Sequence, residues 1–231
     1  MISLKSLIAG LALTGLLTTE AAEAGLWELG AYGGVTFPGI ADVRLQQPNQ
    51  TDVTWHNASS HLSAAYGFNV TYWTPWRGLE LGLQGEVERF DANLKNQNQF
   101  RTGQVKGVPQ AQNEDLNPHD VDITLVGLNL LVRTSLGPIQ PYVGVGGGVA
   151  FADMRIYDYF FEQTRPSDQS DLSISPMWQV IGGVTIPVAG SWYLFTQYKY
   201  SESWHSFDWS NATTSWTITA HHVVGGIGYR F

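Results

Sequence analysis

The last 15 residues of this 231-residue chain constrain its fold more than any other segment. Successive side chains of a β-strand point to opposite faces, so residues two apart share a face. Counted back from the C-terminus, one face is aromatic and apolar apart from a single glycine, and the other is small or polar. The first face holds Phe231, Tyr229, Ile227, Gly225 and Val223, and the second holds Arg230, Gly228, Gly226, Val224 and His222. The pattern predicts a terminal strand with one apolar face.

The position of this apolar face indicates its surroundings. A strand of a soluble β-sandwich can show the same alternation, but here an aromatic residue ends the sequence and nothing follows to bury it. Such a face is stable when lipid surrounds it. A strand can cross a bilayer when its backbone hydrogen bonds are satisfied within a closed barrel. The ending therefore favours a membrane-embedded β-strand.

Residues 1–24 have the pattern of a secretory signal peptide. Lys5 supplies a positive charge, residues 7–17 form a short apolar run, and Ala22 and Ala24 form an A-x-A cleavage site. The run is too short for a membrane-spanning helix. We therefore expect two parts, a signal peptide at 1–24 and one barrel domain at 25–231. The sequence has no cysteine, so neither a lipoprotein anchor nor a disulfide framework is expected.

The composition agrees with a β-barrel. Aromatic residues make up 13% of the chain and there are 25 glycines, which suits short alternating strands with aromatic girdles. No apolar run after residue 24 approaches the roughly 20 residues that a membrane-spanning helix needs. The net charge of −8 argues against a nucleic-acid surface, which would be basic.

Eight segments alternate with strand periodicity, and long and short connections alternate between them. The predicted strands are 26–37, 61–73, 79–90, 121–134, 141–153, 172–186, 192–201 and 217–231, and the predicted long loops are 38–60, 91–118, 154–171 and 202–214. Eight antiparallel strands close into a barrel without a free edge. The predicted fold is all-β: an eight-stranded antiparallel transmembrane β-barrel with short periplasmic turns and long extracellular loops.

The mature chain resembles the small eight-stranded outer-membrane barrels of the OmpA, OmpX and opacity-protein type. The segments that carry the resemblance are 141–150 (PYVGVGGGVA), 198–200 (YKY) and the ending from His221 to Phe231. The resemblance implies that Phe231, Tyr229, Ile227 and Val223 form the signal read by the barrel assembly machinery. Because the sequence stops at Phe231, the periplasmic peptidoglycan-binding domain of full-length OmpA is not expected.

Charged residues on the inward faces are predicted to fill the lumen. An eight-stranded barrel is just wide enough for side chains to occupy its interior, whereas charge facing lipid costs several kcal/mol. Glu86 and Lys199 should lie at similar depth, and Glu28, Glu80 and Arg230 should lie near the periplasmic end. The predicted ion-pair set is Glu28, Glu80, Glu86, Glu88, Lys199 and Arg230. A plug of ion pairs is favoured over the alternative, a narrow gated pore.

Two histidine segments invite chemical hypotheses that the pattern does not favour. His205 and Ser206 with Asp208 could belong to a lipid A deacylase, but they lack the H-x-S spacing of that pattern. His221 and His222 should point to opposite faces of a strand and so should not bind one ion. Neither a catalytic residue, a metal site nor a cofactor is predicted.

The expected function is non-enzymatic: a structural or adhesin-like outer-membrane protein whose exposed loops bind partners. Loops on a rigid scaffold commonly carry binding, and these loops contain aromatic residues such as Trp55 and Trp209. Tyr157 and Trp204 lie nearest the strand ends and are expected to belong to the outer aromatic girdle instead. The expected partners are outer-membrane lipid and lipopolysaccharide, the barrel assembly machinery and a surface ligand on a host or neighbouring cell. A narrow porin-like channel and a lipid A-modifying enzyme are the alternatives.

Overall fold

The computed structural model describes residues 25–48, 51–76, 78–93, 95, 97–116, 120–156, 169–209 and 212–231. The predicted signal peptide, with Ala22 and Ala24, lies outside these residues. In these ranges the structure consists of β-strands, and it contains no helix that could cross a membrane. The strands are β1 (Leu26–Gln47), β2 (Thr51–Ser59), β3 (Ser63–Trp76), β4 (Leu79–Asp91), β5 (Gln97–Val105), β6 (Val108–Leu116), β7 (Asp120–Arg133), β8 (Gln140–Ile156), β9 (Gln169–Ala189), β10 (Trp192–Trp209) and β11 (Ala212–Arg230).

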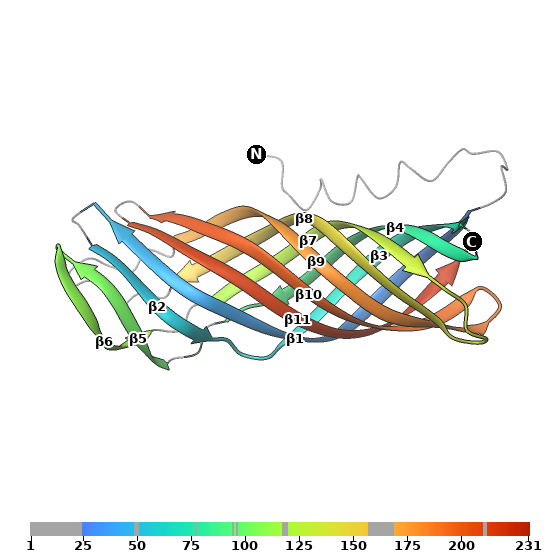
Figure 1. Cartoon of the computed structure of the whole chain (residues 1–231), viewed down its shortest axis with the longest axis horizontal. Helices are drawn as coiled ribbons and strands as arrows, with labels where there is room; N and C mark the ends of the chain where they lie inside the picture. The colour runs from blue at the N-terminus through green and yellow to red at the C-terminus, as the bar shows by residue number, and fades with distance from the viewer. Residues whose placement is uncertain are drawn as a thin grey trace.

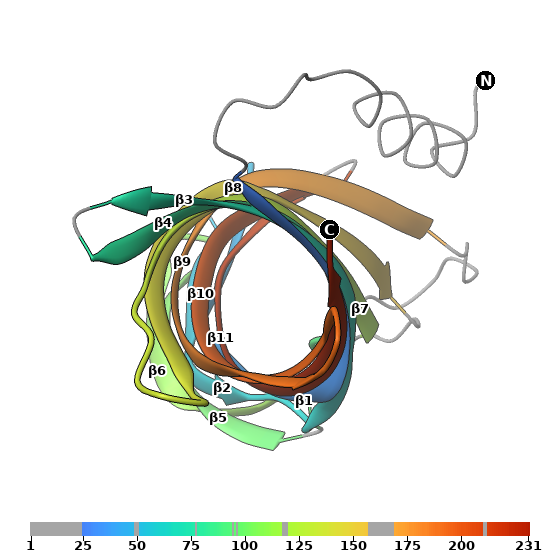
Figure 2. The ribbon, with the colours of Figure 1, turned by 90° about the vertical axis from the view of Figure 1, so that its right-hand side faces the viewer.

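Eight of these strands form a closed ring. Their order is β1, β3, β4, β7, β8, β9, β10 and β11, and β11 pairs with β1 to close it. Every neighbouring pair in the ring is antiparallel. Figure 2 shows the ring almost end-on, and Figure 1 shows its strands tilted across the long axis. The predicted eight-stranded barrel is confirmed.

Three further strands correct the prediction of long loops. β1 continues to Gln47, β2 pairs with its second half, and β5 and β6 extend the sheet from β2. Residues 38–60 and 91–118 are thus largely strand rather than loop. The alternation of buried Val53 and Trp55 with half-exposed Thr54 is a strand pattern, and Pro38 and Pro48 obscured it because proline usually marks a break in a strand.

The last two strands are also longer than predicted. β10 reaches Trp209 and β11 begins at Ala212, so the predicted loop 202–214 is mostly paired strand. We call the combined region the distal extension: β2, β5 and β6 with 39–47 of β1, 203–209 of β10 and 212–219 of β11. It lies at the end of the molecule opposite the C-terminus (Figure 1). Of the predicted loop 154–171, residues 154–156 belong to β8 and 169–171 to β9, and 157–168, including Tyr157, fall outside the described residues.

Glycine sets the short turns at the other end of the ring. Gly78, Gly137 and Gly190 lie in the connections β3–β4, β7–β8 and β9–β10, and their φ angles are 82°, 65° and 56°. Other residues adopt positive φ at a cost, because their Cβ crowds the backbone. The C-terminus lies at this short-turn end (Figure 1), as the even number of ring strands requires.

The outer face of the ring is apolar along most of its length. On β7, for example, Val126, Leu128 and Leu130 are exposed, while Gly127 and Asn129 between them are buried. The same parity holds for the last strand, where Val223, Ile227, Tyr229 and Phe231 are exposed and Val224 is buried. Exposed apolar residues outside and buried polar residues such as Asn129 inside are the reverse of the pattern in a soluble barrel. This pattern matches an environment of lipid. We call this surface the apolar band.

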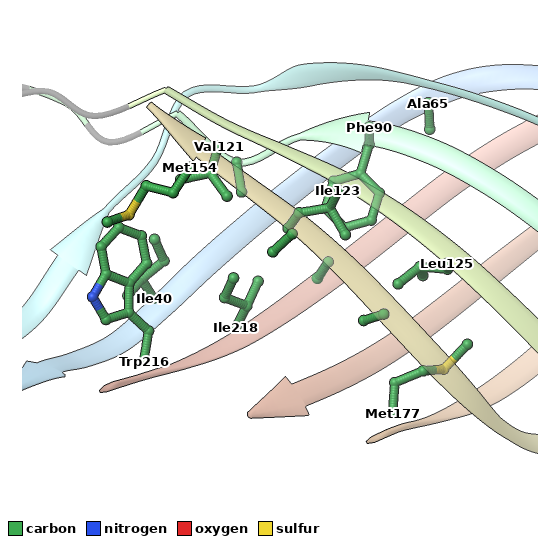
Figure 3. Close-up of a cluster of buried hydrophobic side chains, with 14 of the residues drawn as sticks. Ile40, Ala65, Phe90, Val121, Ile123, Leu125, Met154, Met177, Trp216 and Ile218 are labelled. Atoms are coloured by element: carbon green, nitrogen blue, oxygen red, sulfur yellow. The ribbon is translucent and has the colours of Figure 1, made fainter. Parts of the chain in front are cut away.

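The lumen has an apolar part and a charged part. The apolar part is a cluster of buried side chains from strands on opposite sides of the ring, shown in Figure 3. Most of it lies toward the distal extension, including Ile40, Phe90, Ile123, Met154, Trp216 and Ile218, and its members Tyr32, Tyr193 and Phe195 reach the level of the charged residues. The charged part lies toward the short turns, and it contains the residues described next.

Candidate functional site

Lys199 lies at the centre of the charged part of the lumen. Its side chain is fully buried on the inward face of β10 and forms ion pairs with the carboxylates of Glu86 and Glu88 on β4. The Tyr32 hydroxyl of β1 donates a hydrogen bond to Glu86 and lies 3.3 Å from the Lys199 Nζ. Three strands thus converge on one ammonium group, and the bonds cross the lumen.

His222 adds a second nitrogen base to the same cluster. Its Nδ1 lies 2.8 Å from a Glu88 oxygen and 2.8 Å from the Thr36 hydroxyl, while Nε2 lies 3.0 Å from the Ser201 hydroxyl. Glu86 and Glu88 together carry one more negative charge than Lys199 balances. The His222 ring therefore lies against the carboxylate pair whose charge Lys199 balances only in part.

Amide side chains from β7 and β9 brace the carboxylate of Glu86. Asn129 and Gln179 donate hydrogen bonds of 3.1 and 3.0 Å to the Glu86 Oε2, and Asn129 also donates to Gln84 at 2.9 Å. These residues come from β4, β7 and β9 and are buried. A buried carboxylate is stable only when its lone pairs have partners, and this one is bonded from both sides of the lumen.

A second ion cluster closes the lumen near the short turns. Arg133 on β7 is buried and bonds Glu28 at 2.7 Å and Glu80 at 2.6 Å. Its guanidinium also lies 3.9 Å from the centre of the Trp73 ring, in cation–π contact. Arg230 approaches Glu28 to 2.9 Å. Two arginines balance two glutamates, so this cluster is neutral.

The structure brings all six predicted lumen residues into these two clusters. Glu86, Glu88 and Lys199 meet in one cluster, and Glu28, Glu80 and Arg230 lie in the other. Arg133 and His222 also join these clusters, although neither belongs to the ion-pair set predicted from the sequence. Parity could have included both, because each lies on the inward face of its strand.

The four residues of the predicted assembly signal lie on the outer face of β11. The Phe231 ring contacts the Tyr229 ring in an edge-to-face arrangement at a centroid distance of 5.3 Å, and Tyr229 contacts Trp192 in the same way at 5.1 Å. The Phe231 backbone N–H donates to the Trp27 carbonyl at 3.0 Å, which joins the end of the chain to β1. Ile227 and Val223 continue the same exposed row. Aromatic residues at this level resemble an interfacial girdle.

The residues of the hydrolase hypothesis do not form a triad. His205 points inward, and its ring nitrogens lie 3.3 and 2.9 Å from the hydroxyls of Ser173 and Ser203. Ser206 is exposed on the opposite face, and the side chain of Asp208 is outside the described residues. Burial in the distal extension lowers the pKa of His205 to about 4, so the ring is neutral at ordinary pH.

His221 and His222 point to opposite faces, as strand geometry predicts. His221 is exposed and lies 2.7 Å from the Tyr198 hydroxyl, while His222 is buried in the lumen. Among the described residues, no group of three or more potential ligands is arranged to hold a metal ion.

Comparison with known proteins gives the class of this fold. No protein-family model matches the sequence, and no curated protein matches it. Among solved structures, the outer membrane protease OmpT from Escherichia coli aligns with a TM-score of 0.51 and 8% identity over 93% of this chain and 99% of that chain. OprG from Pseudomonas aeruginosa aligns with a TM-score of 0.50 and 14% identity, over 90% and 96%. Neisserial surface protein A aligns at 0.49 and 12%, over 90% and 100%.

The chain therefore has the fold of bacterial outer-membrane β-barrels. Within that class, its closed ring of eight strands is the small barrel that the resemblance to the OmpA, OmpX and opacity-protein type predicted. At these identities the likeness concerns the fold alone, and the role of the protein has to be argued from its own lumen and surface.

Proposed function

We propose that this protein is an integral protein of the bacterial outer membrane with a structural and adhesin-like role. The observation that carries the proposal is the contrast between a filled lumen and an extended distal surface. The two ion clusters cross the lumen, and the apolar cluster fills it further toward the distal extension. The apolar band supports a location in lipid, including lipopolysaccharide on the outer side.

The filled lumen argues against the narrow-channel alternative. An eight-stranded ring leaves little room beyond its own side chains, and here Lys199 and Arg133 lie across it with their side chains fully buried. An open pathway would require these bonds and the apolar cluster to rearrange together. The proposed role therefore rests on the exterior of the molecule, where the distal extension offers a hydrogen-bonded sheet in place of most of the predicted loops.

A conductance measurement tests the closed lumen. The refolded protein in a planar bilayer should give no stable conductance steps, and Lys199→Met should not create any while the apolar cluster remains. Reproducible unitary steps that change with Glu86→Gln or Lys199→Met would instead establish the channel.

A hairpin deletion tests the role of the distal extension. The Ala92 N–H donates to the Val121 carbonyl at 2.8 Å, so β4 and β7 are already neighbours where β5 and β6 depart. Replacing residues 94–119 by Asn-Gly, a two-residue hairpin turn, should keep the ring and abolish adhesion to host or neighbouring cells. Equal adhesion by this variant, folded to the same extent, would contradict the proposal.

We also propose that Phe231, Tyr229, Ile227 and Val223 direct assembly by the barrel assembly machinery. Deleting Phe231 removes its backbone bond to Trp27 and one ring of the girdle. The variant should reach the outer membrane at a lower yield, measured as the fraction that shifts mobility on boiling. Spontaneous refolding into short-chain lipid vesicles should change much less. An equal loss in both assays would mean that Phe231 acts through stability rather than recognition.

The proposal includes no enzymatic activity. The His205 ring contacts two other serines rather than Ser206, and no nearby carboxylate bonds it among the contacts of the described residues. An altered lipid A profile that depends on Ser206, tested with Ser206→Ala, would establish the lipid-modifying alternative.

A further inference from the structure

The distal extension carries a groove on its outer surface. It has a volume of about 790 Å³, and its walls come from β1, β2, β5, β10 and β11. A volume of this size lies in the range of ligand-binding clefts. The residues that matter here are Asp42, Arg44, Asp52, Trp204, Ser206 and Ser215. The bulge of β1 between Ile40 and Val43 places Asp42 in it.

Trp204 provides an aromatic wall for the groove. Its side chain is 47% exposed, although it lies beyond the apolar band on a strand that continues outward to Trp209. Two of its neighbours on the same face, Ser206 on β10 and Thr217 opposite it on β11, are hydroxyl residues, and Glu202 lies on the other side of it along β10. The exposed indole thus offers a flat apolar face with polar groups beside it.

The opposite wall holds polar groups that are fixed before any ligand arrives. Arg44 donates two hydrogen bonds to Asp52, of 2.9 and 2.6 Å, and about half of each side chain remains exposed. His56 bridges Asp42 at 3.1 Å and Thr102 at 2.8 Å. Side chains held in this way lose little conformational entropy on binding, which is the benefit of preorganisation.

The charge of the groove selects among polar ligands. Asp42 and Asp52 outnumber Arg44, and the hydrogen bond from Arg44 lowers the pKa of Asp52, so that carboxylate stays ionised. Sulfated, phosphorylated or carboxylated ligands would meet an acidic wall. Uncharged ligands with many hydroxyl groups would find carboxylate acceptors and the remaining guanidinium donors, and a sugar ring can also place its apolar C–H face on Trp204.

We propose that this groove binds a neutral oligosaccharide, with one sugar ring stacked on Trp204 and its hydroxyl groups bonded to Asp42, Arg44 and Asp52. The proposal rests on the adhesin-like role proposed above and names the chemistry of the ligand. The same chemistry occurs in the uncharged sugars of lipopolysaccharide and in glycans of other cells, so the experiment has to distinguish these two sources.

A glycan array tests the inference on the full mature chain in detergent micelles. The array carries neutral oligosaccharides of hexose and N-acetylhexosamine from both sources, together with sulfated heparin fragments. We expect binding to a subset of the neutral glycans and none to the sulfated ones. For the tightest glycan, Trp204→Ala should weaken the affinity at least tenfold in calorimetry, and Asp52→Asn should weaken it severalfold.

The matched control is Trp76→Ala. Trp76 is 48% exposed, close to the value for Trp204, but it lies in the β3–β4 region at the short-turn end. This variant should bind glycans with unchanged affinity, and both variants should show the same mobility shift on boiling. Failure to bind any neutral glycan, preference for the sulfated fragments, or equal affinities of the wild type and the Trp204→Ala variant would each overturn the inference.

Treatment of target cells separates this inference from the broader proposal. If glycosidase treatment abolishes adhesion, both stand. If adhesion survives glycosidase treatment and is lost after protease treatment, the adhesin-like role stands and the oligosaccharide groove is wrong. If the protein does not adhere but still binds neutral glycans through Trp204, the groove stands and the adhesive role fails.

Discussion

Lys199 shows how a single buried charge depends on its neighbours. Its ammonium group is fully buried between two carboxylates, and burial of a charge is tolerated only when partners are present. Replacement of one partner in a buried ion pair leaves the others uncompensated, which commonly costs about 3–5 kcal/mol. Replacing all the charged members by apolar or amide groups is far less costly. Both statements can be tested in this lumen.

We expect Lys199→Met to lower the free energy of unfolding by about 3–5 kcal/mol, because Glu86 and Glu88 then face each other without a cation. The triple variant Lys199→Met, Glu86→Gln, Glu88→Gln should recover most of that loss. The measurement is urea unfolding in lipid vesicles, followed by tryptophan fluorescence. A triple variant no more stable than Lys199→Met would show that the loss reflects packing rather than charge.

His205 predicts a pH dependence of the distal extension. Its pKa is about 4 in the folded protein and about 6.5 in an unfolded chain. Below pH 6.5 the unfolded state binds a proton that the folded state does not, so stability falls between pH 6.5 and 4, by about 3 kcal/mol in total. Above pH 6.5 this contribution is constant.

Amide hydrogen exchange of residues 203–209 at pH 7.5, 5.5 and 4.5 measures this effect, after correction for the intrinsic pH dependence of exchange. Protection should decrease in the wild type as the pH is lowered, and it should decrease less in His205→Gln. The control is His221→Gln, because His221 is exposed on the outer face. If His205→Gln retains the whole pH dependence, another group is responsible.

Residue positions in the lumen were predictable from parity, whereas their contacts were not. Alternation alone placed Glu86 and Lys199 inside, since a lipid-facing charge is costly. The partners depend on the stagger of strands around the ring, which a single strand does not encode. For this reason Arg133, on a strand with apolar residues on both faces, was not assigned to Glu28 and Glu80 before the structure showed it.

At the scale of elements, glycine in the short turns should contribute to stability through its positive φ angle rather than through side-chain space. A Cβ added at Gly137 would meet nothing within 4 Å, but φ there is 65°. Gly137→Ala should therefore cost about 1 kcal/mol in unfolding free energy, and Gly137→Asn should cost less because asparagine tolerates this region.

Gly182 is the control for that comparison. An added Cβ at Gly182 also meets nothing within 4 Å, and this strand residue has no positive φ. Gly182→Ala should leave the urea midpoint unchanged or raise it slightly, because alanine restricts the unfolded chain. A similar loss of stability in Gly137→Ala and Gly182→Ala would contradict a backbone origin.

The β5–β6 hairpin shows what sequence reasoning missed at this scale. Its strands are rich in asparagine and glutamine, which are poor strand formers, and the segment was predicted to be a loop. Yet Lys106 and Gly107 form the two-residue connection, with φ of 51° and 76°. Positive φ at both central residues is the signature of a type I′ hairpin turn. The Lys106-Gly107 pair between Val105 and Val108 was the sequence signal for this turn.

At the scale of the whole molecule, the apolar band predicts a dependence on depth. Leu128 is 64% exposed near the middle of β7, and Arg89 and Asp122 form an exposed ion pair toward the distal end. Leu128→Arg should cost about 2–4 kcal/mol in lipid vesicles, and Thr124→Arg, nearer the ion pair, about 0–1 kcal/mol. In detergent micelles both costs should shrink. Equal costs at the two positions would contradict a band that lies in lipid.

The overall class was predictable because one rule, alternation, applies to every strand of the ring. The distal extension was not, because its outward residues are polar, as in a soluble protein, while its inward residues continue the apolar cluster of the lumen. In this region the outward residues face water and are polar, and polar segments of a barrel sequence predict loops. The candidate groove lies in the same region and so was also missed.

The seam between β1 and β11 has a consequence for the timing of biogenesis. β1 and β11 pair with each other to close the ring, and they lie at opposite ends of the described sequence. A ribosome releases β1 long before it makes β11, so every partly synthesised chain carries an unsatisfied edge that invites aggregation. Closure is thus a post-translational event. The cell has to keep the chain unfolded and protected from aggregation until its last strand is available.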